Sequence, residues 1–166
     1  AFGAAPPGVR LSTLGLVRTP GWWWHLPLAI AGGVLLGLGA QLATQLVPST
    51  SQSSIQAFVS WPSGMLSFAL LAVIAPLAEE IFFRGFLYGV LRERSAVFAF
   101  LAAWLLFVVA HGQQTFGQWG ALVAIGVMGL GLTAMRAITK NTLTPALAHL
   151  TYNGLIALQA VYPLET

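Results

Sequence analysis

The apolar stretch from Met65 to Leu91 carries three charged residues near its centre, and this combination constrains the fold more than any other feature of the sequence. The stretch is long enough to cross a bilayer, because a transmembrane helix needs about 20 residues. Glu79, Glu80 and Arg84 lie in its middle, although one charge at the centre of a membrane helix costs on the order of 2.5–3.5 kcal/mol. These side chains therefore need partners from elsewhere in the fold, and such residues are candidates for function.

The composition indicates an integral membrane protein. Hydrophobic residues make up 57% of the 166 residues and charged residues only 7%, whereas soluble domains contain about 25% charged residues. The long apolar runs do not alternate with polar residues, so helices rather than barrel strands are predicted. The net charge of +3 is too small and too evenly spread to indicate a nucleic-acid partner. Cysteine and aspartate are absent, which excludes thiol nucleophiles and intramembrane proteases that use an aspartate pair.

Five apolar segments are predicted to span the membrane. Apart from Arg84, the Lys and Arg residues precede the first segment, separate the second from the third, or separate the fourth from the fifth. The positive-inside rule places these three regions in the cytoplasm, and a bacterial inner membrane is the expected location. We therefore predict an all-α, polytopic membrane helix bundle that is a fragment of a larger bundle. The predicted spans are residues 28–47, 65–91, 96–111, 119–135 and 145–162.

The chain divides into a cytoplasmic or interfacial segment, 1–25, and a membrane domain, 26–166. In the first segment, apolar residues recur at near-helical spacing and predict a short interfacial helix. A run of three tryptophans, 22–24, marks the membrane–water boundary, where indole rings prefer to lie, and His25 is assigned to the same belt. The apolar residues of the interfacial helix are Leu11, Leu14 and Val17.

Local patterns also predict loops and contacts within the membrane domain. Residues 48–64 form the longest polar loop and carry no charge. Gly33 and Gly37 have the spacing that permits close contact between two helices. Thr144 followed by Pro145 is a favourable start for the last helix, with Thr144 as the N-cap.

The three charges of the second span are predicted to have different roles. Adjacent residues of a helix point about 100° apart, so Glu79 and Glu80 do not face one partner. Glu80 and Arg84 share a face and are predicted to form a structural ion pair, which leaves Glu79 free. Pro76 removes a backbone hydrogen bond just before this site and predicts a kink.

Two further pairs of residues complete a possible catalytic set. His149 and Asn153 lie on one face of the last span, where an imidazole and a carboxamide can both donate to one oxygen, as an oxyanion hole requires. Phe107 lies one turn before His111 and is placed to shield it from water. The free carboxylate of Glu79 and a histidine can together hold and deprotonate a water molecule, which is general-base catalysis of hydrolysis.

Each of these residues also has a structural interpretation. His111 lies near the end of its span and is also placed as an interfacial residue. His149 and Asn153 can join helices by hydrogen bonds. A rise of 1.5 Å per residue puts Glu79 and His111 at different depths, so they meet only if the helices tilt or the boundaries of the spans shift. A proton relay through the two glutamates is a further alternative, although the inverted repeats of many transporters are missing.

Together, three motifs resemble those of the CAAX-protease and bacteriocin-processing family (CPBP, also called ABI). The family's EExxxR, FxxxH and HxxxN patterns occur here in the same order, and the resemblance covers roughly residues 60–160. The matching segments are Glu79-Glu80-Ile-Phe-Phe-Arg84, Phe107-Val-Val-Ala-His111 and His149-Leu-Thr-Tyr-Asn153.

The resemblance implies an intramembrane glutamic endopeptidase. In that mechanism Glu79 and His111 activate the hydrolytic water, and His149 and Asn153 stabilise the oxyanion. Glu80, with Arg84 and Phe107, supports the site. Eukaryotic members cleave prenylated CAAX proteins and many bacterial members process peptides, so a peptide or lipidated-protein substrate is expected in the lipid bilayer.

Two alternatives remain within the same family. A zinc enzyme would use Glu79, Glu80, His111 and His149 as ligands. A metal-free mechanism without a cofactor is expected instead, because no HExxH motif is present and the resemblance implies a water activated by glutamate. A non-catalytic member would act as an immunity factor or as a structural subunit of a membrane complex. Family members have more spans than the five readable here, which predicts missing helices of the same protein or partner subunits.

Overall fold

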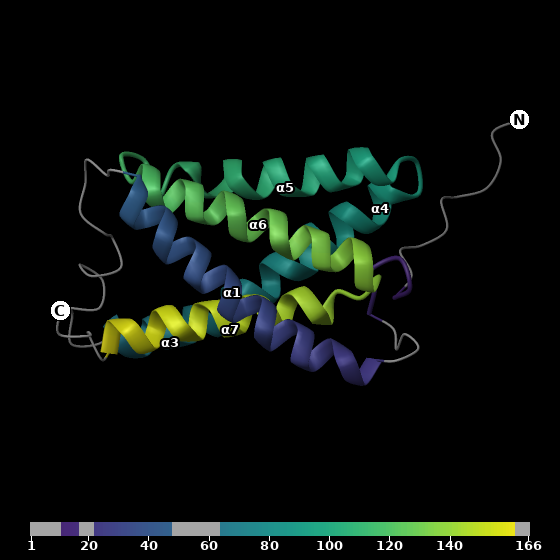
Figure 1. Ribbon diagram of the computed structural model, residues 1–166. Helices are drawn as coiled ribbons and strands as arrows, with labels where there is room; N and C mark the ends of the chain where they lie inside the picture. Colours follow the sequence, from purple (N-terminus) through teal and green to yellow (C-terminus); the bar gives the residue numbers. More distant parts are fainter. Residues whose placement is uncertain (1–10, 17–21, 48–63, 162–166) are drawn as a thin grey trace, which may run out of the picture.

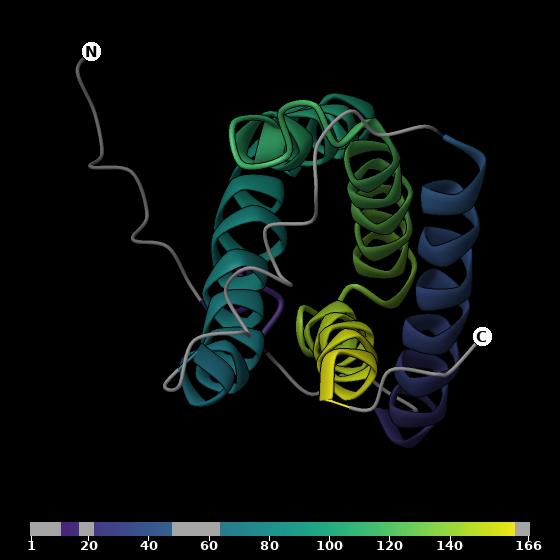
Figure 2. The same cartoon turned by 90° about the vertical axis from the view of Figure 1, so that its left-hand side faces the viewer.

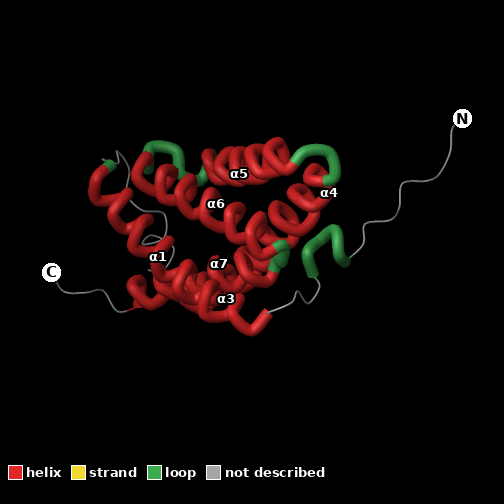
Figure 3. Tube along the Cα trace, turned by 45° about the vertical axis from the view of Figure 1, so that its right-hand side comes forward, coloured by secondary structure: helices red, strands yellow, loops and turns green. Residues whose placement is uncertain are grey.

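The computed structural model describes residues 11–16, 22–47 and 64–161, and the regular structure in these ranges is helical (Figure 3). The all-helical bundle is therefore confirmed, and the bounds of the five predicted spans agree with those of the helices to within a few residues. A 3-10 turn, η1 (Trp22–Trp24), leads into α1 (His25–Leu46). The other elements are α3 (Gly64–Glu80), η2 (Ile81–Leu87), α4 (Tyr88–Arg92), α5 (Ala96–Gly112), α6 (Trp119–Thr139) and α7 (Leu143–Val161).

The helices have the apolar surfaces of a membrane protein. By length and composition, α1 and α6 can each cross a membrane, and α5 is a shorter apolar helix. Large apolar side chains along the outer face of α1, including Leu35, Leu38 and Leu42, are exposed. Side chains of this kind gain nothing from water but are compatible with lipid or with a further helix.

The helices cross one another instead of running parallel. Figure 2 shows α5 and α7 nearly end-on, whereas α1, α4 and α6 are seen from the side. Helix α7 packs between α1 and α3, and α6 contacts α1, α5 and α7 (Figure 1). These crossings bring residues that differ in depth along their own helices to one place, as the meeting of Glu79 and His111 requires.

A close approach of α1 and α7 supports the site-bearing face of α7. A Cβ atom at Gly33 would lie 2.5 Å from the carbonyl oxygen of Ala148 and 2.6 Å from Cβ of Thr151. At Gly37 it would lie 3.3 Å from a methyl group of Leu155. The predicted glycine contact is therefore confirmed, and Gly33 makes the closer approach.

The second predicted span changes its helical geometry at its centre. Helix α3 contains Pro76 and continues beyond it to Glu80. The chain then forms a π-helix, η2, over residues 81–87 before it returns to α-geometry in α4. Segments of π-helix are rare, and they often mark functional sites. The departure from α-geometry thus directly follows the two glutamates.

Two local predictions are wrong. Residues 11–16 form hydrogen-bonded turns in place of the interfacial helix. Thr144 is not the N-cap, because α7 begins at Leu143, whose amide donates to Asn141 Oδ1 at 2.7 Å. His25 contacts the Trp24 ring, and its burial, with Nδ1 3.1 Å from the Thr144 hydroxyl, was not predicted. Except for Gly64, the predicted loop 48–64 lies outside the described residues, as does Val17.

Candidate active site

A buried ion pair forms the base of the site. Arg84 Nη1 lies 2.7 Å from Glu80 Oε1, and both side chains are fully buried, so the predicted pair is confirmed. Helix α6 supplies further acceptors: Arg84 Nη2 donates to the Gly129 carbonyl at 3.0 Å and Nε to the Thr133 hydroxyl at 3.4 Å. The guanidinium is thereby held by two helices, which fixes the orientation of Glu80.

Phe107 packs against both Arg84 and His111. Its ring is fully buried, the Arg84 guanidinium carbon lies 4.3 Å from the ring centroid, and the His111 ring lies 4.4 Å from it. A guanidinium over an aromatic face is attracted by the ring quadrupole. Phe107 therefore packs against the candidate base His111, as predicted, and also contacts Arg84, which the sequence did not indicate.

Glu79 faces two histidines from two other helices. Its Oε1 lies 3.7 Å from His111 Nε2, and its Oε2 lies 3.9 Å from His149 Nε2. The Glu79 side chain is 27% exposed, whereas Glu80 is fully buried. The two adjacent carboxylates thus occupy different environments, and the accessible one faces both imidazole rings.

The hydrogen bonds at the opposite ring nitrogens define how the two histidines are oriented. His111 Nδ1 lies 2.8 Å from the Phe107 carbonyl, and His149 Nδ1 lies 3.0 Å from Glu80 Oε1. A carbonyl accepts and does not donate, so Nδ1 of His111 carries a hydrogen, and in the neutral ring Nε2 has the lone pair. Oε1 of Glu80 likewise accepts from His149 while it accepts from Arg84.

Asn153 lies one turn beyond His149 on α7 and is half-buried. In the described part of the chain its side chain makes no hydrogen bond, so its amide is available to a ligand. The structure thus brings together Glu79, Glu80, Arg84, Phe107, His111 and His149, with Asn153 on the adjoining turn. The contact between His149 and Glu80, and the bonds from Arg84 to α6, were not predicted, because they join residues that no spacing in the sequence connects.

Four of these residues are also the alternative zinc ligands, Glu79, Glu80, His111 and His149. Among the described residues, no three His, Asp or Glu side chains form a group that could hold a metal ion. Glu80 Oε1 is occupied by Arg84 and His149. Glu80 Oε2 is buried without a partner in the described part of the chain.

A comparison with protein families shows the family to which the chain belongs. The family model described as "Type II CAAX prenyl endopeptidase Rce1-like" matches residues 61–155, which is more than half of the chain. The chain belongs to this family. The matched range includes all seven residues of the three motifs, so the resemblance to CAAX-type proteases is confirmed. At this coarse level the chain is a membrane protein of the CAAX-protease type.

The chain is also similar in sequence to three bacterial proteins. The chain is 29% identical over 140 residues to the UPF0177 protein YvdC of Lactococcus lactis, covering 80% of this chain and 52% of the relative. It is 31% identical over 145 residues to an uncharacterized 24.3 kDa protein of Escherichia coli, covering 84% and 64%. It is 27% identical over 95 residues to a Bacillus subtilis protein named "Putative membrane peptidase YdiL", covering 57% and 37%. No solved structure matches.

The chain spans about half to two thirds of the length of the first two of these relatives. One of the three carries a peptidase name, which agrees with the family.

Proposed function

We propose that this chain carries the catalytic site of an intramembrane endopeptidase in which Glu79 and His111 activate a water molecule. The observation that supports this best is the position of Glu79, which is 27% exposed and lies 3.7 Å from His111 Nε2 and 3.9 Å from His149 Nε2. These separations are too long for direct hydrogen bonds. A water molecule beside the carboxylate can therefore be held by Glu79 and His111 together.

The proposed reaction is hydrolysis by general-base catalysis. The water gives a proton to Glu79 or to the free lone pair of His111 Nε2, and the hydroxide attacks the carbon of the scissile peptide bond. The carbonyl electrons move to its oxygen and then return as the carbon–nitrogen bond breaks. The proton held by the base passes to the leaving nitrogen, which departs as an amine. Both side chains are then restored.

His149 and Asn153 are proposed to stabilise the oxyanion. The Asn153 amide can donate, and it lies one helical turn from His149 on the same face of α7. His149 Nδ1 already gives its hydrogen to Glu80 at 3.0 Å. Donation from Nε2 to the oxyanion therefore requires the ring to carry both hydrogens during the reaction. Removing one donor from an oxyanion hole costs about 10²–10³ in rate.

The remaining three motif residues are proposed to support the site. Glu80 orients His149, Arg84 holds Glu80 in place from η2, and Phe107 packs against His111 and excludes bulk water from one side. None of these three is proposed to contact the reacting atoms.

The membrane arrangement and the substrate are part of the same proposal. We infer a multi-pass protein of the bacterial inner membrane with its basic loops in the cytoplasm. Its substrate is a peptide or lipidated protein reached through the lipid bilayer. Because the chain spans only part of its relatives' length, further helices or partner subunits are proposed to complete the substrate cavity.

The experiment is a cleavage assay of the intact protein in liposomes. The probes are a fluorogenic peptide with and without a prenylated cysteine. Glu79→Gln and His111→Gln are each expected to lower kcat by about 10²–10⁴, the range for a general base. Glu93→Gln is the matched control, because Glu93 is an exposed glutamate beyond the end of α4. Full activity of Glu79→Gln would refute the mechanism. The non-catalytic alternative predicts that the wild-type protein cleaves neither probe.

A further inference from the structure

A second buried arginine, Arg136, joins the π-helix to the rest of the fold. It lies on α6, is 2% exposed, and its Nε donates to the backbone carbonyl of Arg84 at 2.9 Å. Its Nη2 donates to the Thr13 carbonyl at 3.3 Å. The guanidinium carbon lies 5.1 Å from the Tyr88 ring centroid. The Arg136 side chain of α6 therefore contacts η2, α4 and the turn formed by residues 11–16, called the N-terminal turn below.

The bond to Arg84 occupies a carbonyl that the helix itself has left without its usual donor. In an α-helix the amide of Tyr88 would donate to the carbonyl four residues before it, which is that of Arg84. In this structure the Tyr88 amide donates to the carbonyls of Phe83 and Gly85. A buried carbonyl without a donor is costly. Arg136 Nε supplies the donor that the π-turn removes.

This bond bears directly on the candidate site. The π-helix begins immediately after Glu79 and Glu80 and contains Arg84. If η2 relaxed to an α-helix, the Tyr88 amide would take back the Arg84 carbonyl, and every residue before it would turn relative to α4. Glu79 would then no longer face His111, and Glu80 would no longer face His149. The π-geometry thus sets the direction of the two carboxylates.

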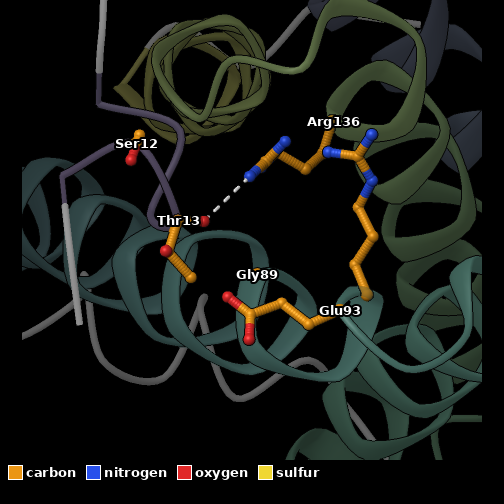
Figure 4. A pocket seen from close by; sticks show the side chains of 6 residues that line it. Ser12, Thr13, Gly89, Glu93 and Arg136 are labelled. Carbon is orange, nitrogen blue, oxygen red and sulfur yellow. Dashed lines mark hydrogen bonds between the residues drawn. The ribbon is translucent and has the colours of Figure 1, made fainter. Parts of the chain in front are cut away.

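The N-terminal turn, which accepts a hydrogen bond from Arg136, is itself held in place by Thr142 and α4. The Thr142 amide donates to the Gly15 carbonyl at 3.0 Å, and the Thr142 hydroxyl donates to the Leu14 carbonyl at 2.5 Å. The turn lies against α4 so closely that a Cβ atom on Gly89 would collide with the Thr13 carbonyl. Figure 4 shows this turn above α4, with the Thr13 carbonyl bonded to Arg136.

We propose that Arg136 is a positioning residue: by donating to the Arg84 carbonyl it holds the π-helix that directs Glu79 and Glu80 into the site. Its effect on catalysis rests on the proposed function, whereas its effect on the helix does not. Arg136 is distinct from the seven motif residues, and its proposed effect on the site passes through the backbone of η2.

The first test measures hydrogen exchange of backbone amides in the intact protein. Arg136→Gln removes the guanidinium. Arg136→Lys keeps the charge but lacks the planar fork that serves two carbonyls. Both are expected to accelerate exchange in residues 81–92, Gln more than Lys, while residues 96–112 of α5 stay unchanged. Arg92→Gln is the control, because Arg92 is exposed and lies beside Arg136 in the lining of a cavity between the N-terminal turn and α4. Equal acceleration in all helices, or none in residues 81–92, would overturn the proposal.

The second test separates positioning from substrate binding. With a wild-type protein that cleaves the fluorogenic peptide, Arg136→Gln is expected to lower kcat by about 10- to 100-fold, since small misplacements of catalytic groups have effects of this size. KM should change little, because Arg136 makes no proposed substrate contact. An unchanged kcat, or a loss confined to KM, would refute positioning. If the wild-type protein does not cleave, the proposed function fails, and the exchange measurement still decides the role of Arg136.

Discussion

The two adjacent glutamates allow a matched test of the site's stability, because the same substitution removes one charge from either position. Glu80→Gln leaves Arg84 buried and without a counter-charge, and breaking one side of a buried ion pair costs about 3–5 kcal/mol. Arg84 keeps its bond to the Gly129 carbonyl and its contact with Phe107. We therefore expect the lower end of this range, about 3 kcal/mol. Glu79→Gln should cost less than about 0.5 kcal/mol, because Glu79 is partly exposed and its ion-pair distances are 3.7 and 3.9 Å.

The assay is unfolding of the intact protein in detergent micelles by added sodium dodecyl sulfate. The six tryptophans of the chain provide the fluorescence signal. Each variant is compared with the wild type in the same micelles, so that the detergent contributes equally. An equal loss of stability in Glu79→Gln and Glu80→Gln would refute the assignment of different environments to the two carboxylates. A larger loss in Glu79→Gln would contradict it more strongly.

Two glycine pairs give further predictions. Gly33→Ala should destabilise the fold by about 1–3 kcal/mol through overpacking, because the added methyl group meets the Ala148 carbonyl. Gly37→Ala should be nearly neutral, because its methyl group meets a Leu155 side chain that can move. The same unfolding assay compares the two variants, and equal losses of stability would refute the close contact at Gly33. Gly89→Ala should speed hydrogen exchange in residues 11–16 by displacing the turn, and Gly85→Ala, which meets only ordinary contacts, should not.

Most of the fold could be predicted from the sequence because it depends on local patterns. Apolar runs of membrane-spanning length gave the five helical segments, and the i,i+4 spacing gave the ion pair of Glu80 with Arg84. Residues four apart on a helix share a face in any α-helical fold. The glycine contact at Gly33 was predicted for the same reason, because small residues permit close helix packing wherever two helices cross.

The errors and omissions concern contacts between distant segments. His25 was assigned to the tryptophan belt from its neighbours, but its burial and its contact with Thr144, 119 residues away, were not predicted. The π-helix was not predicted, and the bond that Arg136 donates to it joins residues 52 apart along the chain. The bond from His149 to Glu80 likewise depends on how α7 crosses α3. Such contacts follow from the tertiary arrangement and not from spacing.

The proposed mechanism depends most on Glu79 and His111 acting together on one water molecule. A double-mutant cycle tests this directly. The intact protein in liposomes would be assayed for cleavage as Glu79→Gln, His111→Gln and the double variant. Groups that act as a unit have non-additive effects on the rate. The proposed mechanism predicts that the double variant is no slower than the slower single variant. Losses that multiply would show that the two residues act independently and would contradict the account.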